Sequence, residues 1–296
     1  MPSARLPASS NTGSRPRRSV SPHPSIARPS TSSSTGRGDP MADHTDAEAQ
    51  LIRCENRDGI AVVLLNRPRQ RNALSYDSWT ELSIALGGLV AYGDRGVVLA
   101  GADGFFCAGG DLKTGPAHGN GPLSPAGRVE HAQRVMEQLK ALPVPTIAAV
   151  EGAAVGLGWS LALSCDLVVC ASDAFFAAPF VARAVVPDGG LAWRLTQQLG
   201  RHRAASFLLR GTRMSGFEAE KLGLVTDVVD PGSAIDRALA IASELAQADA
   251  GAVEMTKRLI NSAESAQLAA FHPLELAMAT VAQQRSAAVE GRTAFS

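Results

Sequence analysis

The sequence predicts an α/β domain in which strand, strand, helix units repeat along the chain and a helical C-terminal third follows. Two observations lead to this prediction. Short apolar runs bounded by Gly, Pro or Asn indicate buried strands. They alternate with longer segments whose apolar residues recur every three or four positions, as in amphipathic helices. Because the two signals alternate, we expect the helices to cover the sheets.

The first elements are two strands and the helix that follows them. Strands are expected at 51–55 and 60–66, and the intervening turn signal Asn56-Arg57-Asp58-Gly59 predicts a hairpin. A helix is expected from Tyr76 to about residue 90, and the apolar run 97–100 between glycines predicts a buried strand.

The next elements follow a Gly-, Pro- and His-rich loop at 115–125. Apolar residues at helical spacing predict a helix over 128–142, which Pro143 stops. Strand 146–150 then leads through a glycine cluster into an apolar helix that ends near Ser164. The remaining apolar runs predict short strands at 167–170, 175–177 and 225–229. Apart from the last of these, the chain from Leu191 onward is expected to be helical.

Composition excludes several classes of protein. The 28 basic and 28 acidic residues give a net charge of zero, which argues against a nucleic-acid binder that neutralises phosphates. A hydrophobic fraction of 45% argues against general disorder, and the apolar runs are too short to cross a membrane. The four cysteines form no C-x-x-C pair, so we expect small buried thiols in a reducing, cytoplasmic compartment.

The charge is unevenly distributed along the chain. Residues 1–40 carry +5 and the rest carries −5, and these forty residues hold 11 Ser and 7 of the 17 Pro. Such a segment buries too little apolar surface to fold, and its prolines oppose the amphipathic helix of a transit peptide. We expect a disordered tail, with Met41 as an alternative start. The domain is then predicted as a core at 41–230 and a C-terminal helical region at 231–296.

Two glycine-rich segments are candidates for chemistry. In 105–112 the amide of Ala108 is a candidate donor to an oxygen that becomes negative, although a simple turn explains the glycines equally well. The cluster at 152–158 departs from the dinucleotide fingerprint. Ser160 follows it in a near match to a nucleophile elbow, with Asp188 and His202 in hydrolase order, but serine in an apolar helix is more often a packed residue.

Asp188 lies between an apolar segment and two glycines, directly before a predicted helix. It is either the N-cap of that helix or a carboxylate in an apolar pocket, where poor solvation would make it a stronger base. The six histidines show no metal-binding spacing, so no metal site is expected.

Taken together, the motifs resemble the crotonase superfamily, the enoyl-CoA hydratase/isomerase family, over nearly all of 41–296. The matching segments occur in the family's order: 66–68, 71–74, 106–112, 143–146, 149–152, 156–158, 164–167, 187–190, 211–227 and 257–261.

The resemblance implies a spiral of strand, strand, helix turns whose helical C-terminal region builds homotrimers or homohexamers. It implies an acyl-CoA substrate, with coenzyme A as part of that substrate and no separate cofactor. Its thioester carbonyl would be held by two backbone amides, which by motif position belong to Ala108 and Leu157. Arg71 is the candidate for the nucleotide phosphates. The other implied substrate-binding residues are Ala73, Leu74, Gly109, Gly110, Asp111, Leu112, Gly156 and Phe180.

Departures from the family pattern narrow the reaction. Family hydratases hold water between two glutamates, and those positions are Ser160 and Phe180 here. The motif around Asp188 looks like that of phenylacetate-type enoyl-CoA isomerases, in which this aspartate is the base. We therefore expect an isomerase that uses Asp188. The alternatives are another crotonase reaction (hydratase, dehalogenase, decarboxylase or thioesterase) and a catalytically silent acyl-CoA-binding subunit.

Overall fold

The computed structural model describes residues 50–89, 93–113 and 121–284, so the predicted tail at 1–40 lies outside the described residues. The strands are β1 (Ile52–Arg57), β2 (Ile60–Leu65), β3 (Gly96–Gly101), β4 (Thr146–Val150), β5 (Ala153–Val155), β6 (Leu167–Ala171), β7 (Phe175–Ala177), β8 (Met214–Ser215) and β9 (Asp227–Val229). The α-helices are α1 (Tyr76–Leu89), α2 (Pro125–Lys140), α3 (Leu157–Ala162), α4 (Leu191–Leu199), α5 (Arg201–Arg210), α6 (Gly216–Lys221), α7 (Ala234–Ala246) and α8 (Ala250–Gln284).

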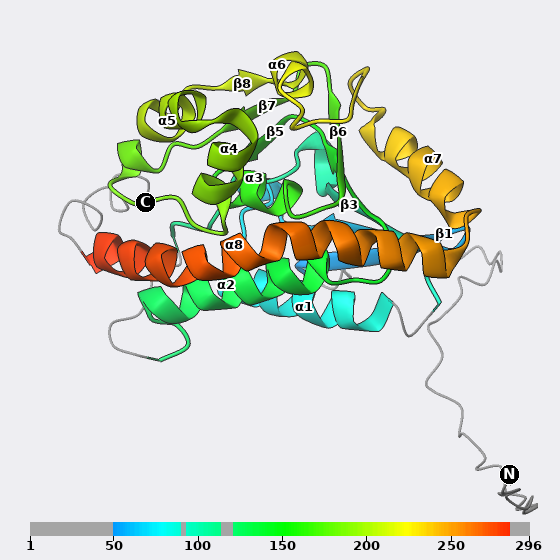
Figure 1. Ribbon diagram of the computed structural model, residues 1–296, viewed down its shortest axis with the longest axis horizontal. Coiled ribbons are helices and arrows are strands. Elements are labelled where there is room, and N and C mark those ends of the chain that lie inside the picture. The colour runs from blue at the N-terminus through cyan, green and yellow to red at the C-terminus, as the bar shows by residue number, and fades with distance from the viewer. Residues whose placement is uncertain (1–49, 90–92, 114–120, 285–296) are drawn as a thin grey trace, which may run out of the picture. The chain divides into compact units, whose positions relative to one another are not determined.

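The strands form two sheets, which confirms the predicted α/β spiral. The larger sheet has the order β1-β2-β3-β4-β6-β9, in which β1 and β2 form the predicted antiparallel hairpin and the other pairs are parallel. The smaller sheet has the order β5-β7-β8. The chain passes from β4 to β5 and later from β6 to β7, so these two units each contribute one strand to each sheet (Figure 1).

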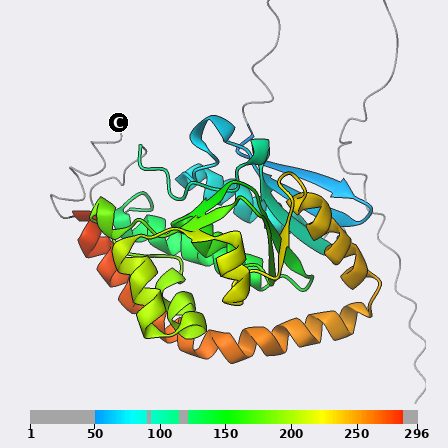
Figure 2. The ribbon, with the colours of Figure 1, turned by 90° about the horizontal axis from the view of Figure 1, so that it is seen from above.

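Both faces of the larger sheet are buried at its central strands β2, β3 and β4, which explains the continuous apolar runs of these strands. Alternate residues of β2 face opposite sides: Val63 belongs to the core cluster that contains α1 and α2, and Val62 to the cluster beneath α7. Helix α7 lies along one face of the larger sheet (Figure 2). It buries Ala234, Ala238 and Ala242, which are spaced one helical turn apart, against that face. Although α7 lies beyond the boundary predicted at 230, it belongs to the same compact unit as the sheet.

Helices α2 and α8 pack against each other below the spiral (Figure 1). Helix α2 begins three residues before the predicted start, because Ser124 caps it by accepting a hydrogen bond from Gly127 N at 3.1 Å. Helix α8 is attached to the spiral by Lys257, whose Nζ lies 2.6 Å from a carboxylate oxygen of Asp166.

The structure differs from the prediction in the details of the later elements. The apolar helix α3 ends at Ala162, two residues early, and the region from Leu191 onward is interrupted. Gly200, with φ of +74°, separates α4 from α5, and the two-residue strand β8 was too short to give an alternating pattern. None of the helices in the described residues is both long and apolar enough to span a membrane.

Candidate active site

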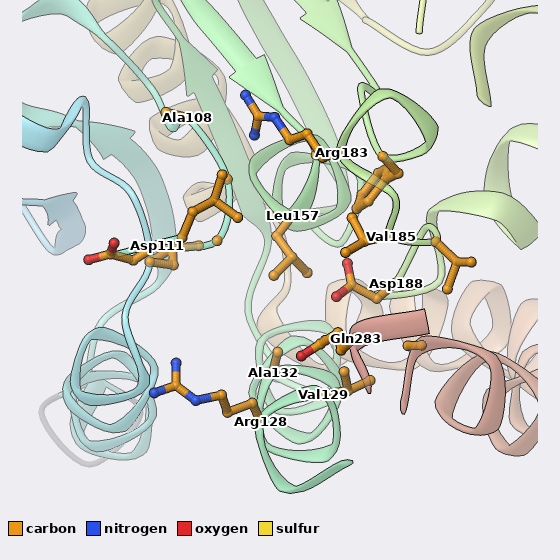
Figure 3. A pocket seen from close by; sticks show the side chains of 18 of the residues that line it. Ala108, Asp111, Arg128, Val129, Ala132, Leu157, Arg183, Val185, Asp188 and Gln283 are labelled. Carbon is orange, nitrogen blue, oxygen red and sulfur yellow. The ribbon is translucent and has the colours of Figure 1, made fainter. Parts of the chain in front are cut away.

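A pocket of about 1020 Å³, its open mouth included, lies between the loop after β3, the start of α3, the Asp188 loop and helices α2 and α8 (Figure 3). Its walls are largely apolar, and charged side chains are few, as in sites for small organic ligands. The apolar lining includes Leu74, Trp79, Ala108, Leu112, Val129, Ala132, Leu157, Pro179, Phe180, Val185, Val186 and Ala279. The charged lining comprises Asp111, Arg128, Arg183 and Asp188.

The glycine-rich loop after β3 is joined to β5 by backbone hydrogen bonds. Cys107 N donates to Ala153 O at 3.0 Å, and Val155 N donates to Cys107 O at 2.9 Å. Gly109 has a φ of +99°, and a Cβ there would lie 2.7 Å from Val155 O. Only glycine therefore fits at this position, because both the dihedral angle and the close approach exclude a side chain.

The prediction that the Ala108 amide is an open donor is wrong. Its N–H donates to Arg71 O at 2.9 Å, and no described helix follows it until α2. The open donor of this loop is instead the amide of Gly110. Two hydrogen bonds join the loop to Leu74, and their donors are the amides of Leu74 and Asp111, so neither bond uses the amide of Gly110. The N–H of Gly110 itself points away from Leu74 and has no acceptor among the described residues.

The second open donor is the amide of Leu157, as predicted from the motif position. Leu157 is the first residue of α3, where an N–H has no acceptor within the helix, and none is found elsewhere in the described ranges. The two donors adjoin: a Cβ on Gly110 would lie 3.3 Å from Leu157 Cδ1, and one on Gly109 would lie 3.6 Å from Leu157 N. Two backbone donors beside one pocket can stabilise a single negatively charged oxygen.

Asp188 contributes a carboxylate to the same pocket, and Figure 3 shows this carboxylate on the side that faces Leu157. The residue as a whole is half-buried, but Oδ1 is shielded from solvent and has no hydrogen-bond partner in the described part of the chain. Burial, and secondarily the charge of Glu275, raises the pKa of Asp188 to about 8. The alternative that Asp188 caps a helix is wrong, because Gly190 is the N-cap of α4 and receives no side-chain cap.

Ser160 supports the Asp188 loop and is not a nucleophile. The Ser160 side chain is 0% exposed, and its Oγ donates to Asp188 O at 3.0 Å and to Gly156 O at 3.3 Å. His202, the third member of the hydrolase order, is exposed on α5. The serine hydrolase prediction is therefore wrong, because Ser160 is buried and bonded to backbone carbonyls, whereas the His202 that should activate it is exposed.

Comparison with known proteins identifies the family of this site. The family model for enoyl-CoA hydratase/isomerase matches residues 55–296. The chain belongs to the enoyl-CoA hydratase/isomerase family. A probable enoyl-CoA hydratase of Rhodobacter capsulatus is 34% identical over 245 residues, which cover 82% of this chain and 94% of that protein. The 1,2-epoxyphenylacetyl-CoA isomerase of Escherichia coli is 34% identical over 241 residues, which cover 80% of this chain and 92% of that protein.

Solved structures agree with this membership of the crotonase superfamily. The structure of Pseudomonas aeruginosa OdaA superposes with a TM-score of 0.75 at 30% identity, and the match covers 83% of this chain and 99% of that one. An enoyl-CoA hydratase of Mycobacterium avium subsp. paratuberculosis gives a TM-score of 0.75 at 28% identity, with coverage of 86% and 100%.

Within this family the substrate is an acyl-CoA, and most residues predicted to bind it line the pocket. Two do not: Arg71 is exposed with its guanidinium 5.7 Å from the Phe105 ring centroid, and Ala73 contributes its carbonyl to a hydrogen bond from Arg67. The predicted residues that do line the pocket are Leu74, Gly109, Gly110, Asp111, Leu112, Gly156 and Phe180.

The family's two hydratase glutamates are absent, and the pocket offers little to replace them. Asp111 is the other carboxylate of the lining, and it pairs with Arg67 at 2.8 Å. Asp188 is therefore the lining carboxylate best placed for proton transfer. Within the described ranges no three His, Cys, Asp or Glu side chains gather closely enough to hold a metal ion.

Three charged residues of the site were missed by the sequence analysis. Arg128 and Arg183 line the pocket, and Glu275 binds the Asp188 loop from α8. Their sequence signal is weak, because a charged residue on an amphipathic helix or in a loop is usually exposed. Only the packing of α2 and α8 brings Arg128 to the pocket and Glu275 to the Asp188 loop.

Proposed function

We propose that the protein is an enoyl-CoA isomerase in which Asp188 moves a proton along the acyl chain. The observation that carries this proposal is the shielded Asp188 carboxylate in an apolar pocket that also contains the open amides of Gly110 and Leu157. A carboxylate with a pKa near neutrality is suited to both removing and returning a proton.

The reaction needs one base and one oxyanion site. The thioester carbonyl oxygen accepts hydrogen bonds from the amides of Gly110 and Leu157. Ionised Asp188 removes a proton from C2 of a 3-enoyl-CoA, and the electron pair delocalises into the carbonyl as an enolate. The same carboxyl returns the proton at C4, which gives the 2-enoyl-CoA and restores the carboxylate. The amides bind a charge that exists only along the reaction path, so they accelerate the step.

Hydration is the second candidate, because two of the similar proteins above are named enoyl-CoA hydratases, one of them as probable. Adding water across a double bond requires a group that activates the water and a group that protonates carbon. Ser160 and Phe180 stand where the family's hydratases carry those groups, and Ser160 is already bonded to backbone carbonyls. The geometry therefore favours isomerisation.

The coenzyme A moiety would extend from the pocket past basic side chains. Arg128 and Arg183 are the lining cations, and we propose that they meet the anionic part of the substrate in addition to Arg71. No cofactor enters the proposed reaction, because the thioester itself provides the electron sink.

We also propose a homotrimer or homohexamer built through the C-terminal helices. Helix α8 exposes several large apolar side chains along the described part of its surface, and such a surface favours self-association. They are Met255, Leu259, Ile260, Leu274, Met278 and Val281. Light scattering of the purified protein tests this proposal, and a monomer at micromolar concentration would contradict it.

The decisive experiment follows 3-enoyl-CoA isomerisation and 2-enoyl-CoA hydration by wild type, Asp188→Asn and the exposed control Asp173→Asn. We expect isomerisation that falls roughly a thousand-fold in Asp188→Asn and is unchanged in Asp173→Asn. Equal turnover by Asp188→Asn would exclude Asp188 as the base. Rapid hydration of the 2-enoyl-CoA by wild type would instead identify a hydratase.

A further inference from the structure

A second carboxylate, that of Glu275 on α8, lies buried against the loop that carries Asp188. Glu275 is 4% exposed, and both of its carboxylate oxygens accept the N–H of Gly190 at 3.0 Å. One of them also accepts from Gln133 Nε2 of α2 at 2.9 Å. The bonds to Gly190 join residues 85 positions apart, so they attach α8 directly to the loop that carries Asp188.

The loop after Asp188 is held at three consecutive residues. Ser160 Oγ donates to Asp188 O at 3.0 Å, Arg194 donates to Gly189 O at 2.9 Å, and Glu275 accepts from Gly190 N. Both glycines have positive φ angles, +64° and +77°. Glycine can adopt many backbone conformations, so the two glycines alone would not hold the loop in this one. The three hydrogen bonds hold it there and thereby define the direction of the Asp188 side chain.

The contacts of Gly189 restrict the loop further. A Cβ at that position would lie 2.9 Å from both Met136 Cε and Ser160 Cβ. The loop is thus packed closely on one side and bonded to Glu275 on the other. Loss of the Glu275 carboxylate would leave the buried N–H of Gly190 without its acceptor.

The charges around Glu275 come from several elements. Asp188 faces it from the loop, and Arg194 faces it from α4. Arg194 also lies 3.5 Å from Glu264, which pairs with Lys140 of α2. Burial lowers the pKa of half-buried His272 on α8. The charge of Glu137 opposes this effect, and the charges of Arg194 and Lys140 add to it.

The two buried carboxylates affect each other. Burial raises the pKa of Glu275, and the hydrogen bonds from Gln133 and Gly190 together with the charge of Arg194 oppose this rise. Burial first, and then the negative charge of Glu275, raises the pKa of Asp188 to about 8. Removing the Glu275 charge should therefore make Asp188 easier to ionise.

We propose that Glu275 is a positioning residue for the reaction, in which its bond to Gly190 aims the Asp188 carboxylate. The negative charge of Glu275 then also affects the pH at which Asp188 accepts a proton. This inference rests on the proposed function of Asp188 as the base. It assigns α8 a part in the active site, because a residue of that helix determines the state of the catalytic group.

The test compares Glu275→Gln, Glu275→Ala and the matched control Glu254→Gln, which removes a partly exposed carboxylate that pairs with Arg258 on the same helix. In Glu275→Gln the amide oxygen still accepts from Gly190, so kcat stays near that of wild type while the acidic limb of the pH profile moves down by about one unit. In Glu275→Ala the acceptor is lost, and kcat falls roughly ten-fold with little change in KM. Glu254→Gln behaves as wild type.

A second readout separates this inference from the proposed function. The carboxylic-acid C=O stretch of Asp188, obtained as the infrared difference between wild type and Asp188→Asn, gives its titration midpoint without any substrate. The same difference in the Glu275→Gln background should have a midpoint about one pH unit lower. An unmoved midpoint would refute the role of Glu275, whether or not isomerase activity is found. A lowered midpoint in a protein without isomerase activity would refute only the proposed reaction.

Discussion

The free energy of unfolding should depend on pH through the titration of Asp188. Its pKa is about 8 in the folded state, against 3.8 for an ordinary aspartate, so the folded protein binds this proton more tightly than the unfolded chain. The stabilisation is fully present below about pH 4 and is lost as the pH rises through about 8. Asparagine at this position does not titrate, so Asp188→Asn should escape the loss.

The magnitude follows from the difference between the two pKa values. One unit corresponds to about 1.4 kcal/mol, so four units set an upper limit of about 6 kcal/mol at alkaline pH. Because the residue as a whole is half-buried beside an open pocket, water relieves part of this cost. We expect Asp188→Asn to exceed wild type by about 3 kcal/mol in free energy of unfolding at pH 9.

Urea unfolding of both proteins between pH 4 and 9, followed by circular dichroism, measures this difference. The advantage of Asp188→Asn should grow steadily with pH, and exposed Asp173→Asn should show no such trend. A difference that stays constant from pH 4 to 9 would refute the assignment of a raised pKa to Asp188. If wild type instead gained stability relative to Asp188→Asn as the pH rises, the pKa of Asp188 would be lowered in the folded state, not raised.

Two further predictions concern the residues that shape the pocket. Gly109→Ala introduces a Cβ 2.7 Å from Val155 O at a φ of +99°. This substitution should lower the free energy of unfolding by about 2 kcal/mol or more and abolish activity. A melting temperature and activity like those of wild type would contradict the close approach. Ser160→Ala removes the bond to Asp188 O and should cost about 1 kcal/mol of stability and only a few-fold of kcat, whereas complete loss of activity would restore a nucleophilic role for this serine.

The sequence located many of the structural elements because their signals are local. The Asn56 to Gly59 turn, the apolar run of β3 and the helical spacing of α2 each depend on neighbouring residues, and the structure places elements at all three. The boundaries moved where a cap or a glycine decides them, as at Ser124 and Gly200. Two-residue β8 was missed because it forms only by pairing with β7.

The proposed oxyanion site shows how far the position of a motif predicts which amide is open. The sequence indicated the right loop, but it assigned the donor to Ala108 because nothing local distinguishes one exposed amide from its neighbour. A hydrogen bond to Arg71 O, from a distant segment, occupies Ala108 and leaves Gly110 open. Arg71 itself was chosen for its charge, whereas packing places it outside the pocket lining and places Arg128 within it.

The sequence by itself determined that the chain folds as an α/β spiral, that the family's two glutamates are replaced by Ser160 and Phe180, and that an aspartate precedes two glycines at 188. These are properties of residue type and spacing. Only the tertiary structure decided that the Asp188 carboxylate is shielded within a pocket, and that Glu275 of α8 lies against its loop. The physical reason is that solvation and hydrogen-bond partners are supplied by segments far apart in the chain, and folding alone brings them together.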